Sequence, residues 1–250
     1  MGAKTSNQSS MSNLYRLVFD PSQQTADTVR LTKEQEHYLK RVLRFQRGDR
    51  FIVINGQGKS WLAELNGANA HLLEIISLKT ELAVNLTLIT ALPKGNGYEQ
   101  VLKCGTELGV SQFIPVKSDR SLLKPSSNKV DRWRKIVTEA AEQAEREIVP
   151  QIIEPLPFKQ AITELIPQKS NSYICVARGD FPSLWSCLQT SPQSEIAIAT
   201  GAEGGWTENE IKIAQTQQFK SVSLGKSILR AVTAPIAAAT LVNAIFNENN

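Results

Sequence analysis

The chain has 250 residues, enough for one large or two small domains, and its 41% hydrophobic content is sufficient to build a buried core. The formal net charge of +4 permits nucleic acid as a partner without requiring it. No apolar run approaches the roughly 20 residues of a membrane span. The three cysteines form no CxxC pair and the two histidines lack metal-ligand spacing, so we expect no metal site and a reducing cytoplasm.

The first part of the chain predicts a polar tail followed by a small β-rich domain. Residues 1–13 are rich in serine and asparagine and lack the apolar centre of a signal peptide, so we expect a disordered tail. Strands are predicted at 14–19 and 72–76, and the Asn55-Gly56 pair between 51–54 and 59–65 predicts a hairpin. We therefore place a first domain at 14–82.

A helix is predicted within that domain over 34–45, opened by a capping box at Thr32. His37, Arg41 and Arg44 occur at i, i+4 and i+7, so an α-helix would present them on one face. Such a basic ridge suits RNA phosphates. Charge alone equally fits a solvated helix face.

Residues 83–250 predict a second domain of α/β units with a parallel sheet. A strand at 84–92 is followed by a turn at 93–97, a helix and a strand at 113–116. A long helix is predicted over 131–147. Its polar face, which includes Glu142, fits either an ordinary ion pair or the lining of a pocket or interface.

Two glycine loops each follow an apolar run near the end of the chain. They are Gly201-Ala-Glu-Gly-Gly-Trp206 and Ser223-Leu-Gly-Lys-Ser-Ile-Leu-Arg230, and a helix is predicted after each. Loops that leave the carboxyl ends of parallel strands commonly bind a ligand, with backbone amides close to it. Two tight turns with nothing bound remain the alternative. A Rossmann fingerprint would come after the first strand instead, and no Walker sequence is present.

Both loops resemble motifs of a known family, as do further segments in the same order. These segments are Thr106-Glu-Leu-Gly-Val110, Asp119-Arg-Ser121, Glu139-Ala-Ala-Glu-Gln143 and His37-x-x-x-Arg-Val-Leu-Arg44. The family is ribosomal RNA small subunit methyltransferase E, the 16S rRNA uridine-N3 methyltransferases of the SPOUT superfamily. The resemblance extends from about residue 14 to 248.

The resemblance implies a PUA-like β-barrel, then a SPOUT α/β-knot domain with a parallel sheet and a trefoil knot, in a homodimer. It implies S-adenosylmethionine as cofactor and 16S rRNA or the small ribosomal subunit as partner. The implied cofactor-binding residues are Thr200, Gly201, Glu203, Gly204, Gly205, Leu224, Gly225, Ile228 and Leu229. The implied RNA-binding residues are His37, Arg41, Arg44, Lys94 and Arg120.

Arg230 is the candidate catalytic residue, because a cation beside uridine O2 or O4 would stabilise the anion that forms at N3. Arginine remains protonated and is not assigned as a base; Glu203 and Glu142 are the possible bases. The sequence departs from the family's motifs at three positions. Ala202 replaces a proline, Glu145 stands where glycine is frequent, and Val232 replaces an acid. The change at Val232 leaves open an RNA-binding protein of this fold with another RNA target or without catalysis.

Overall fold

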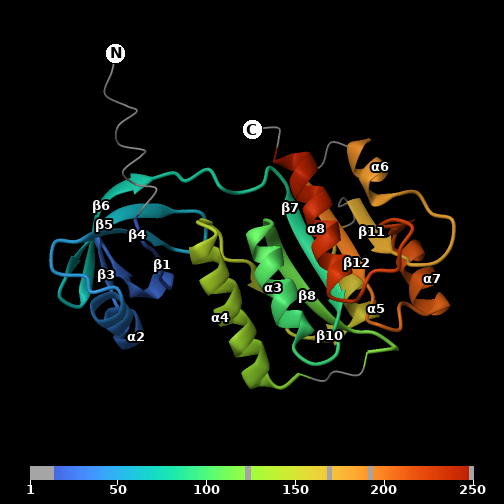
Figure 1. Cartoon of the computed structure of the whole chain (residues 1–250), viewed down its shortest axis with the longest axis horizontal. Coiled ribbons are helices and arrows are strands. Elements are labelled where there is room, and N and C mark those ends of the chain that lie inside the picture. The colour runs from blue at the N-terminus through green and yellow to red at the C-terminus, as the bar shows by residue number, and fades with distance from the viewer. Residues whose placement is uncertain (1–13, 122–124, 168–170, 191–193, 248–250) are drawn as a thin grey trace, which may run out of the picture. The chain divides into compact units, whose positions relative to one another are not determined.

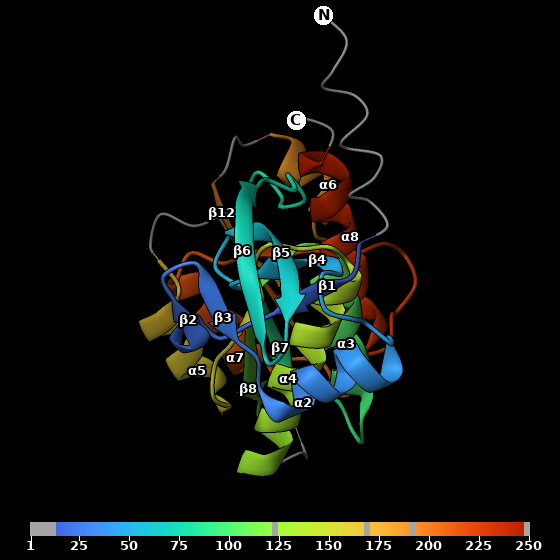
Figure 2. The ribbon, with the colours of Figure 1, turned by 90° about the vertical axis from the view of Figure 1, so that its left-hand side faces the viewer.

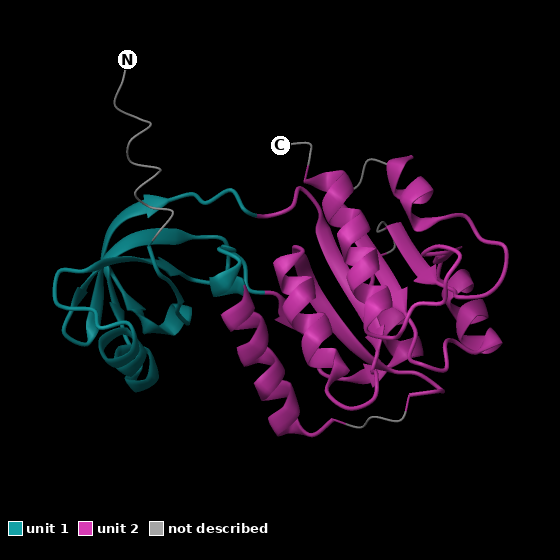
Figure 3. Ribbon diagram, in the orientation of Figure 1, with its two compact units in different colours: residues 1–80, 141–149 teal, residues 81–140, 150–250 magenta. Residues whose placement is uncertain are grey.

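The computed structural model describes residues 14–121, 125–167, 171–190 and 194–247, so the predicted tail lies outside the described residues. The chain divides into two compact units (Figure 3). The first comprises Met1–Thr80 and Ala141–Val149, and the second comprises Glu81–Ala140 and Pro150–Asn250. The sequence suggested a single crossing near residue 82, and it gave no indication that 141–149 returns to the first unit.

The first unit is a curved, six-stranded sheet in the order β1-β4-β5-β6-β3-β2 (Figure 2). Its strands are β1 (Arg16–Val18), β2 (Gln24–Thr25), β3 (Thr28–Arg30), β4 (Arg50–Ile54), β5 (Ser60–Asn66) and β6 (Asn69–Ile76). β1 pairs with β4 in parallel, and the other pairs are antiparallel. A short 3-10 turn, η1 (Pro21–Gln23), follows β1. Alternate residues of the strands, among them Leu17, Phe51 and Val53, form the buried core.

The predicted hairpin is present, and its turn explains why β4 and β5 pair. The Asn55 side chain accepts hydrogen bonds from the backbone N–H groups of Gln57 (2.9 Å) and Lys59 (3.0 Å). Gly56 adopts a φ of +69°. An asparagine that bonds its own turn in this way stabilises the reversal, and glycine tolerates the left-handed backbone without steric cost.

The predicted helix 34–45 begins as expected but changes its winding. α2 (Lys33–His37) opens with a full capping box between Thr32 and Gln35. The chain then continues as a π-helix, η2 (Tyr38–Val42), and Arg44 lies beyond it with a φ of +60°. Wider π turns and a left-handed residue break the 3.6-residue period. The prediction that His37, Arg41 and Arg44 share one α-helical face is therefore wrong.

The segment 141–149 is held in the first unit by its carboxylates and backbone. The Val18 N–H donates to Glu142 Oε1 (2.6 Å), and the Ser60 hydroxyl donates to Glu147 Oε1 (2.8 Å). Arg16 pairs with Glu145 at 2.5 Å. The Glu142 carboxylate therefore binds the backbone of β1 within the first unit. Glu145 has a φ of +60°, which accounts for the glycine that the family frequently has there.

The second unit contains a sheet in the order β10-β8-β7-β12-β11-β13, with β9 also paired to β8. All these pairs are parallel, as predicted. Its strands are β7 (Asn85–Ala91), β8 (Val110–Lys117), β9 (Gln151–Ile152), β10 (Leu156–Pro157), β11 (Asn171–Cys175), β12 (Glu195–Thr200) and β13 (Lys220–Val222). Its helices are α3 (Gly97–Glu107), α4 (Ser127–Gln143), α5 (Phe158–Gln160), η3 (Ala161–Leu165), α6 (Leu184–Gln189), α7 (Glu208–Thr216) and α8 (Thr233–Phe246).

Helices cover the second sheet on both faces, with α3 and α8 together on one of them (Figure 1). On the other face, α5, η3 and α7 enclose a core that includes Ile89, Ala199 and Trp206. Because both faces are covered, β7 and β12 are almost continuously buried. None of the helices within the described ranges is long and apolar enough to span a membrane.

The strand order decides where the site forms. In the sheet, β12 lies between β7 and β11, and β11 lies between β12 and β13. In the sequence, however, β11 precedes both β12 and β13. Parallel strands have their carboxyl ends at the same edge of the sheet. The loops after β7, β11, β12 and β13 therefore leave from one edge, and both glycine loops are among them.

Candidate functional site

A cavity of about 600 Å³ opens between the two glycine loops of the second unit. This volume lies within the range typical of small-molecule sites. All the predicted cofactor-binding residues except Thr200 line it. They are joined by Arg120, the segment Cys175–Arg178 at the end of β11, Trp206 and residues at the start of α7 and α8.

The first glycine loop approaches its surroundings too closely for a side chain at Gly201. A Cβ on Gly201 would lie 3.2 Å from the Cα of Gly205, which is backbone and cannot move aside cheaply. The Gly205 N–H donates to the Ala202 carbonyl (2.8 Å) and closes a tight turn, with Gly205 at a φ of +68°. Ala202 is buried in the core, where the family has proline. The loop ends at Thr207, which caps α7.

The loop after β8 braces the first glycine loop. One guanidinium nitrogen of Arg120 donates to the carbonyls of Gly204 (2.6 Å) and Trp206 (3.3 Å). Asp119 accepts the Thr207 hydroxyl (3.0 Å), and its backbone N–H donates to Glu210 (2.9 Å). The resemblance implied that Arg120 contacts RNA. In the structure, Arg120 lines the cavity and its side chain holds the backbone of the first glycine loop.

The second glycine loop is more open. The Ser223 hydroxyl bonds the backbone N–H and C=O of Gly225 (3.1 and 3.0 Å), and Gly225 has a φ of +129° with open space around it. Ile228 lines the cavity and is 63% exposed, so the second loop presents an apolar side chain to solvent at the cavity. Arg230 is exposed; its neighbours Leu229 and Ala231 line the cavity, whereas Arg230 is not itself among the lining residues.

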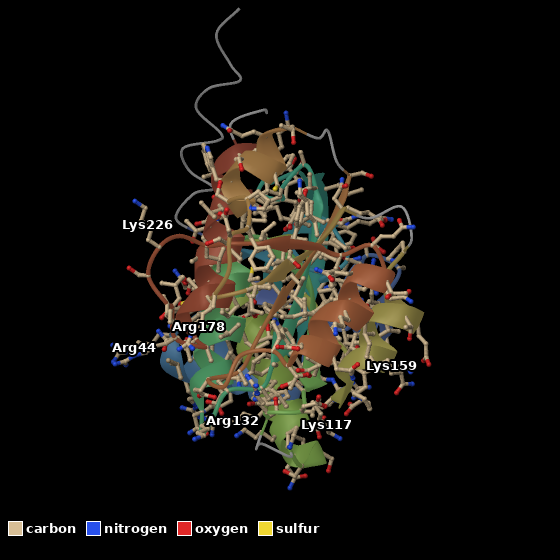
Figure 4. All side chains as sticks on the ribbon, turned by 90° about the vertical axis from the view of Figure 1, so that its right-hand side faces the viewer. Arg44, Lys117, Arg132, Lys159, Arg178 and Lys226 are labelled. Atoms are coloured by element: carbon tan, nitrogen blue, oxygen red, sulfur yellow. The ribbon has the colours of Figure 1, made fainter. Side chains whose placement is uncertain are left out.

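The sequence gave no reason to include the residues after β11. Cys175 and Arg178 line the cavity only because β11 lies between β12 and β13. Burial raises the pKa of Cys175 to about 12, so its thiol stays neutral at physiological pH. Arg178 is exposed and supplies a cation to the cavity mouth; Figure 4 labels it together with Lys226, which projects outward from the second glycine loop.

Two buried polar atoms at the first glycine loop have no hydrogen-bond partner among the described residues. They are the hydroxyl of Thr200, which ends β12, and the indole N–H of Trp206, whose ring stacks on Phe158 at 4.3 Å. Buried polar groups without partners are rare and are commonly completed by a ligand or water. Of the two residues, Trp206 lines the cavity, so its indole N–H is available to a polar group bound there.

The remaining predicted site residues lie outside the cavity lining. Lys94 is exposed on the loop after β7, and its backbone N–H donates to Glu203 Oε1 (3.0 Å). Glu142 is not among the residues that line the cavity, and its Oε1 accepts the Val18 N–H within the first unit, so its role as a base stays a prediction. Val232 contacts the same loop as Lys94, since a Cβ on Gly97 would lie 2.6 Å from its Cγ2.

The first unit exposes the cations that were predicted to bind RNA. His37, Arg41 and Arg44 are all exposed, and so are Tyr38 (42%) and Val42 (55%) beside them. His37 ends α2, Arg41 lies in η2, and Arg44 lies two residues beyond η2. Among the residues that the structure describes, no group of His, Cys, Asp or Glu is arranged to hold a metal ion.

Comparison with known proteins connects both units to one family. Residues 80–243 match the RNA methyltransferase domain, and residues 31–76 match the RNA methyltransferase PUA domain. Ribosomal RNA small subunit methyltransferase E of Synechocystis sp. is 48% identical to this chain, with 94% of this chain and 78% of the relative covered. The chain belongs to the ribosomal RNA small subunit methyltransferase E family. The Bacillus subtilis member is 30% identical over 87% of this chain and 90% of its own length.

A solved structure of the family member from Neisseria gonorrhoeae, bound to S-adenosyl methionine, superposes with a TM-score of 0.85 at 29% identity. It covers 93% of this chain and 98% of its own. Family membership confirms the predicted family, the fold class and the methyltransferase activity. The assignment of individual residues rests on the geometry described above.

Proposed function

We propose that this protein transfers the methyl group of S-adenosylmethionine to N3 of a uridine in 16S ribosomal RNA of the small subunit. The observation that carries the proposal is the cavity formed where both glycine loops leave the carboxyl edge of the sheet. Relatives named for small-subunit ribosomal RNA, and a related structure that contains S-adenosyl methionine, support the substrate and the cofactor.

The cavity residues fit this cofactor. Gly201, Gly204 and Gly205 line the cavity at the first loop without side chains, and Leu224 with Gly225 lines it at the second. Ile228 and Leu229 offer apolar surface to an adenine ring. The unpartnered Thr200 hydroxyl lies at the base of the first loop. When bound, S-adenosylmethionine supplies an electrophilic methyl group on a positively charged sulfur.

Arg230 is proposed as the catalytic residue. Uridine N3 becomes a competent nucleophile when its proton leaves, and negative charge then spreads onto O2 and O4. Arg230 directly follows cavity residue Leu229 and is exposed toward solvent, so its guanidinium can reach a base presented at the cavity. Because the guanidinium stays protonated, it stabilises the anion but does not remove the proton.

RNA binding is proposed for the exposed cations of both units. His37, Arg41 and Arg44 would contact phosphates from the first unit, and Lys94 from the loop after β7. Phosphate contacts position an RNA, and the target base must leave its stack to reach the methyl donor. We further propose a homodimer that acts in the cytoplasm, where the ribosomal substrate and a reducing environment for the free cysteines coincide.

Incubation with labelled S-adenosylmethionine and either small-subunit RNA or whole subunits tests the proposal. We expect label in N3-methyluridine, identified by mass spectrometry of the digested nucleosides. Calorimetry without RNA measures cofactor binding separately. Cofactor binding without methyl transfer to any uridine would instead favour an RNA-binding protein that has lost catalysis, the alternative raised by Val232.

A further inference from the structure

Glu203 joins two loops that the sequence does not connect. It lies in the tight turn of the first glycine loop, is exposed, and lines the cavity. Its Oε1 accepts the backbone N–H of Lys94 at 3.0 Å, although 109 residues separate the two in sequence. A hydrogen bond to an ionised carboxylate is stronger than a neutral one, so this contact fixes the start of the Lys94 loop.

The loop Pro93–Gly97 is also held from other directions. The Lys129 ammonium donates to the Gly95 carbonyl at 3.2 Å. Gly97 has room only for a hydrogen, because a Cβ there would lie 2.6 Å from Val232 Cγ2, just after the second glycine loop. The loop after β7 therefore touches both segments that form the cavity, through Glu203 on one and Val232 on the other.

We infer that Glu203 is a positioning residue for the methyl transfer: its carboxylate holds the loop after β7 against the cofactor cavity, so that the Lys94 ammonium meets the incoming RNA. The Lys94 side chain itself is exposed and therefore depends on its backbone for its position. This role differs from the general base that the sequence left open for Glu203, because positioning needs only an acceptor oxygen for the Lys94 N–H, whereas a base must take up the N3 proton. The contact between Lys94 and RNA rests on the proposed function. The hydrogen bond between Glu203 and Lys94 is independent of it.

Two substitutions separate these roles. Glu203→Gln keeps an acceptor oxygen for the Lys94 N–H but cannot act as a base, and Glu203→Ala removes the acceptor. Amide hydrogen exchange of Lys94, followed by NMR on the full-length protein, reports the bond without any reaction. We expect exchange in Glu203→Ala to accelerate about tenfold or more, and exchange in Glu203→Gln to stay within about threefold of the unaltered protein.

Kinetics with S-adenosylmethionine and small-subunit RNA supply the second readout. Glu203→Gln should keep the shape of the pH profile of kcat, because a positioning residue takes up no proton during the reaction. Glu203→Ala should raise KM for RNA about tenfold or more, and Lys94→Ala should raise it similarly without adding to the effect of Glu203→Ala. Calorimetry with the cofactor alone checks that the cavity remains intact in each variant.

The inference is overturned if Glu203→Gln is as inactive as Glu203→Ala and loses the acidic limb of the pH profile, because the carboxylate would then be a base. Unchanged Lys94 exchange in Glu203→Ala would also overturn it. If the unaltered protein binds cofactor but methylates no uridine, the proposed function fails, while the exchange experiment still decides whether Glu203 holds the loop.

Discussion

Glu145 provides a quantitative test of the segment that returns to the first unit. It has a left-handed φ of +60°, where a residue with a Cβ costs about 1 kcal/mol more than glycine. Its carboxylate also pairs at 2.5 Å with Arg16, whose side chain is only 8% exposed, whereas that of Glu145 is 45% exposed. A charge-assisted bond of this kind, discounted for the exposed partner, contributes about 1–2 kcal/mol.

Glu145→Gly removes both effects and Glu145→Ala removes only the ion pair. We therefore expect Glu145→Ala to lose about 1–2 kcal/mol of unfolding free energy. Glu145→Gly should lose about 0–1 kcal/mol, because relief of backbone strain offsets part of the lost pair. Urea unfolding, followed by circular dichroism, measures both variants.

The difference between the two variants isolates the backbone, since both lack the carboxylate. If Glu145→Ala is as stable as Glu145→Gly, the left-handed conformation carries no cost and the account of the family's glycine fails. A Glu145→Gly variant that is more stable than the unaltered protein by 1 kcal/mol or more would show that the pair with Arg16 contributes nothing.

Further predictions concern the site. Gly201→Ala should weaken S-adenosylmethionine binding about tenfold or more in calorimetry and also lower the melting temperature, because its Cβ would press on the Gly205 backbone and shift the loop; unaltered affinity and melting temperature would contradict this reasoning. Arg230→Ala should lower kcat about 100-fold with cofactor affinity preserved, and Arg230→Lys should recover part of it; a loss confined to KM would point to RNA binding. Arg41→Ala with Arg44→Ala should weaken RNA binding and reduce its salt dependence by a slope of about 1–2, and an equal slope would leave a merely solvated surface. Cys175 should resist iodoacetamide at pH 8.5 until the protein is denatured, because burial raises its pKa to about 12; the same shift means that stability falls as pH rises past the ordinary value of 9.0.

Local sequence determined most elements in this protein. The apolar runs at β7 and β12, the Asn55-Gly56 turn and the capping box at Thr32 all formed where short-range rules predicted them. The order of the motifs likewise identified the family. These features depend on residues within one turn or strand, where steric and hydrogen-bonding preferences act without distant partners.

The helical segment that carries the basic residues shows what short-range sequence rules do not predict. Its sequence has an α-helical period, yet the chain widens into a π-helix at Tyr38 and turns left-handed at Arg44. Leu39 within it is fully buried against the β-sheet of the first unit. The period of the charged residues in the sequence carries no information about this packing.

By itself, the sequence determined which residues form the glycine loops, because glycine and the apolar runs before it specify strand, turn and helix locally. Only the tertiary structure decided what surrounds those loops. The parallel pairing of β11 between β12 and β13 brought Cys175 and Arg178 to the cavity. Contacts across long sequence separations gave Glu203 its bond to Lys94 and Glu142 its bond to Val18. Such pairings are selected by the burial of both faces of a sheet and by the need to satisfy backbone N–H groups, and both conditions exist only in the folded chain.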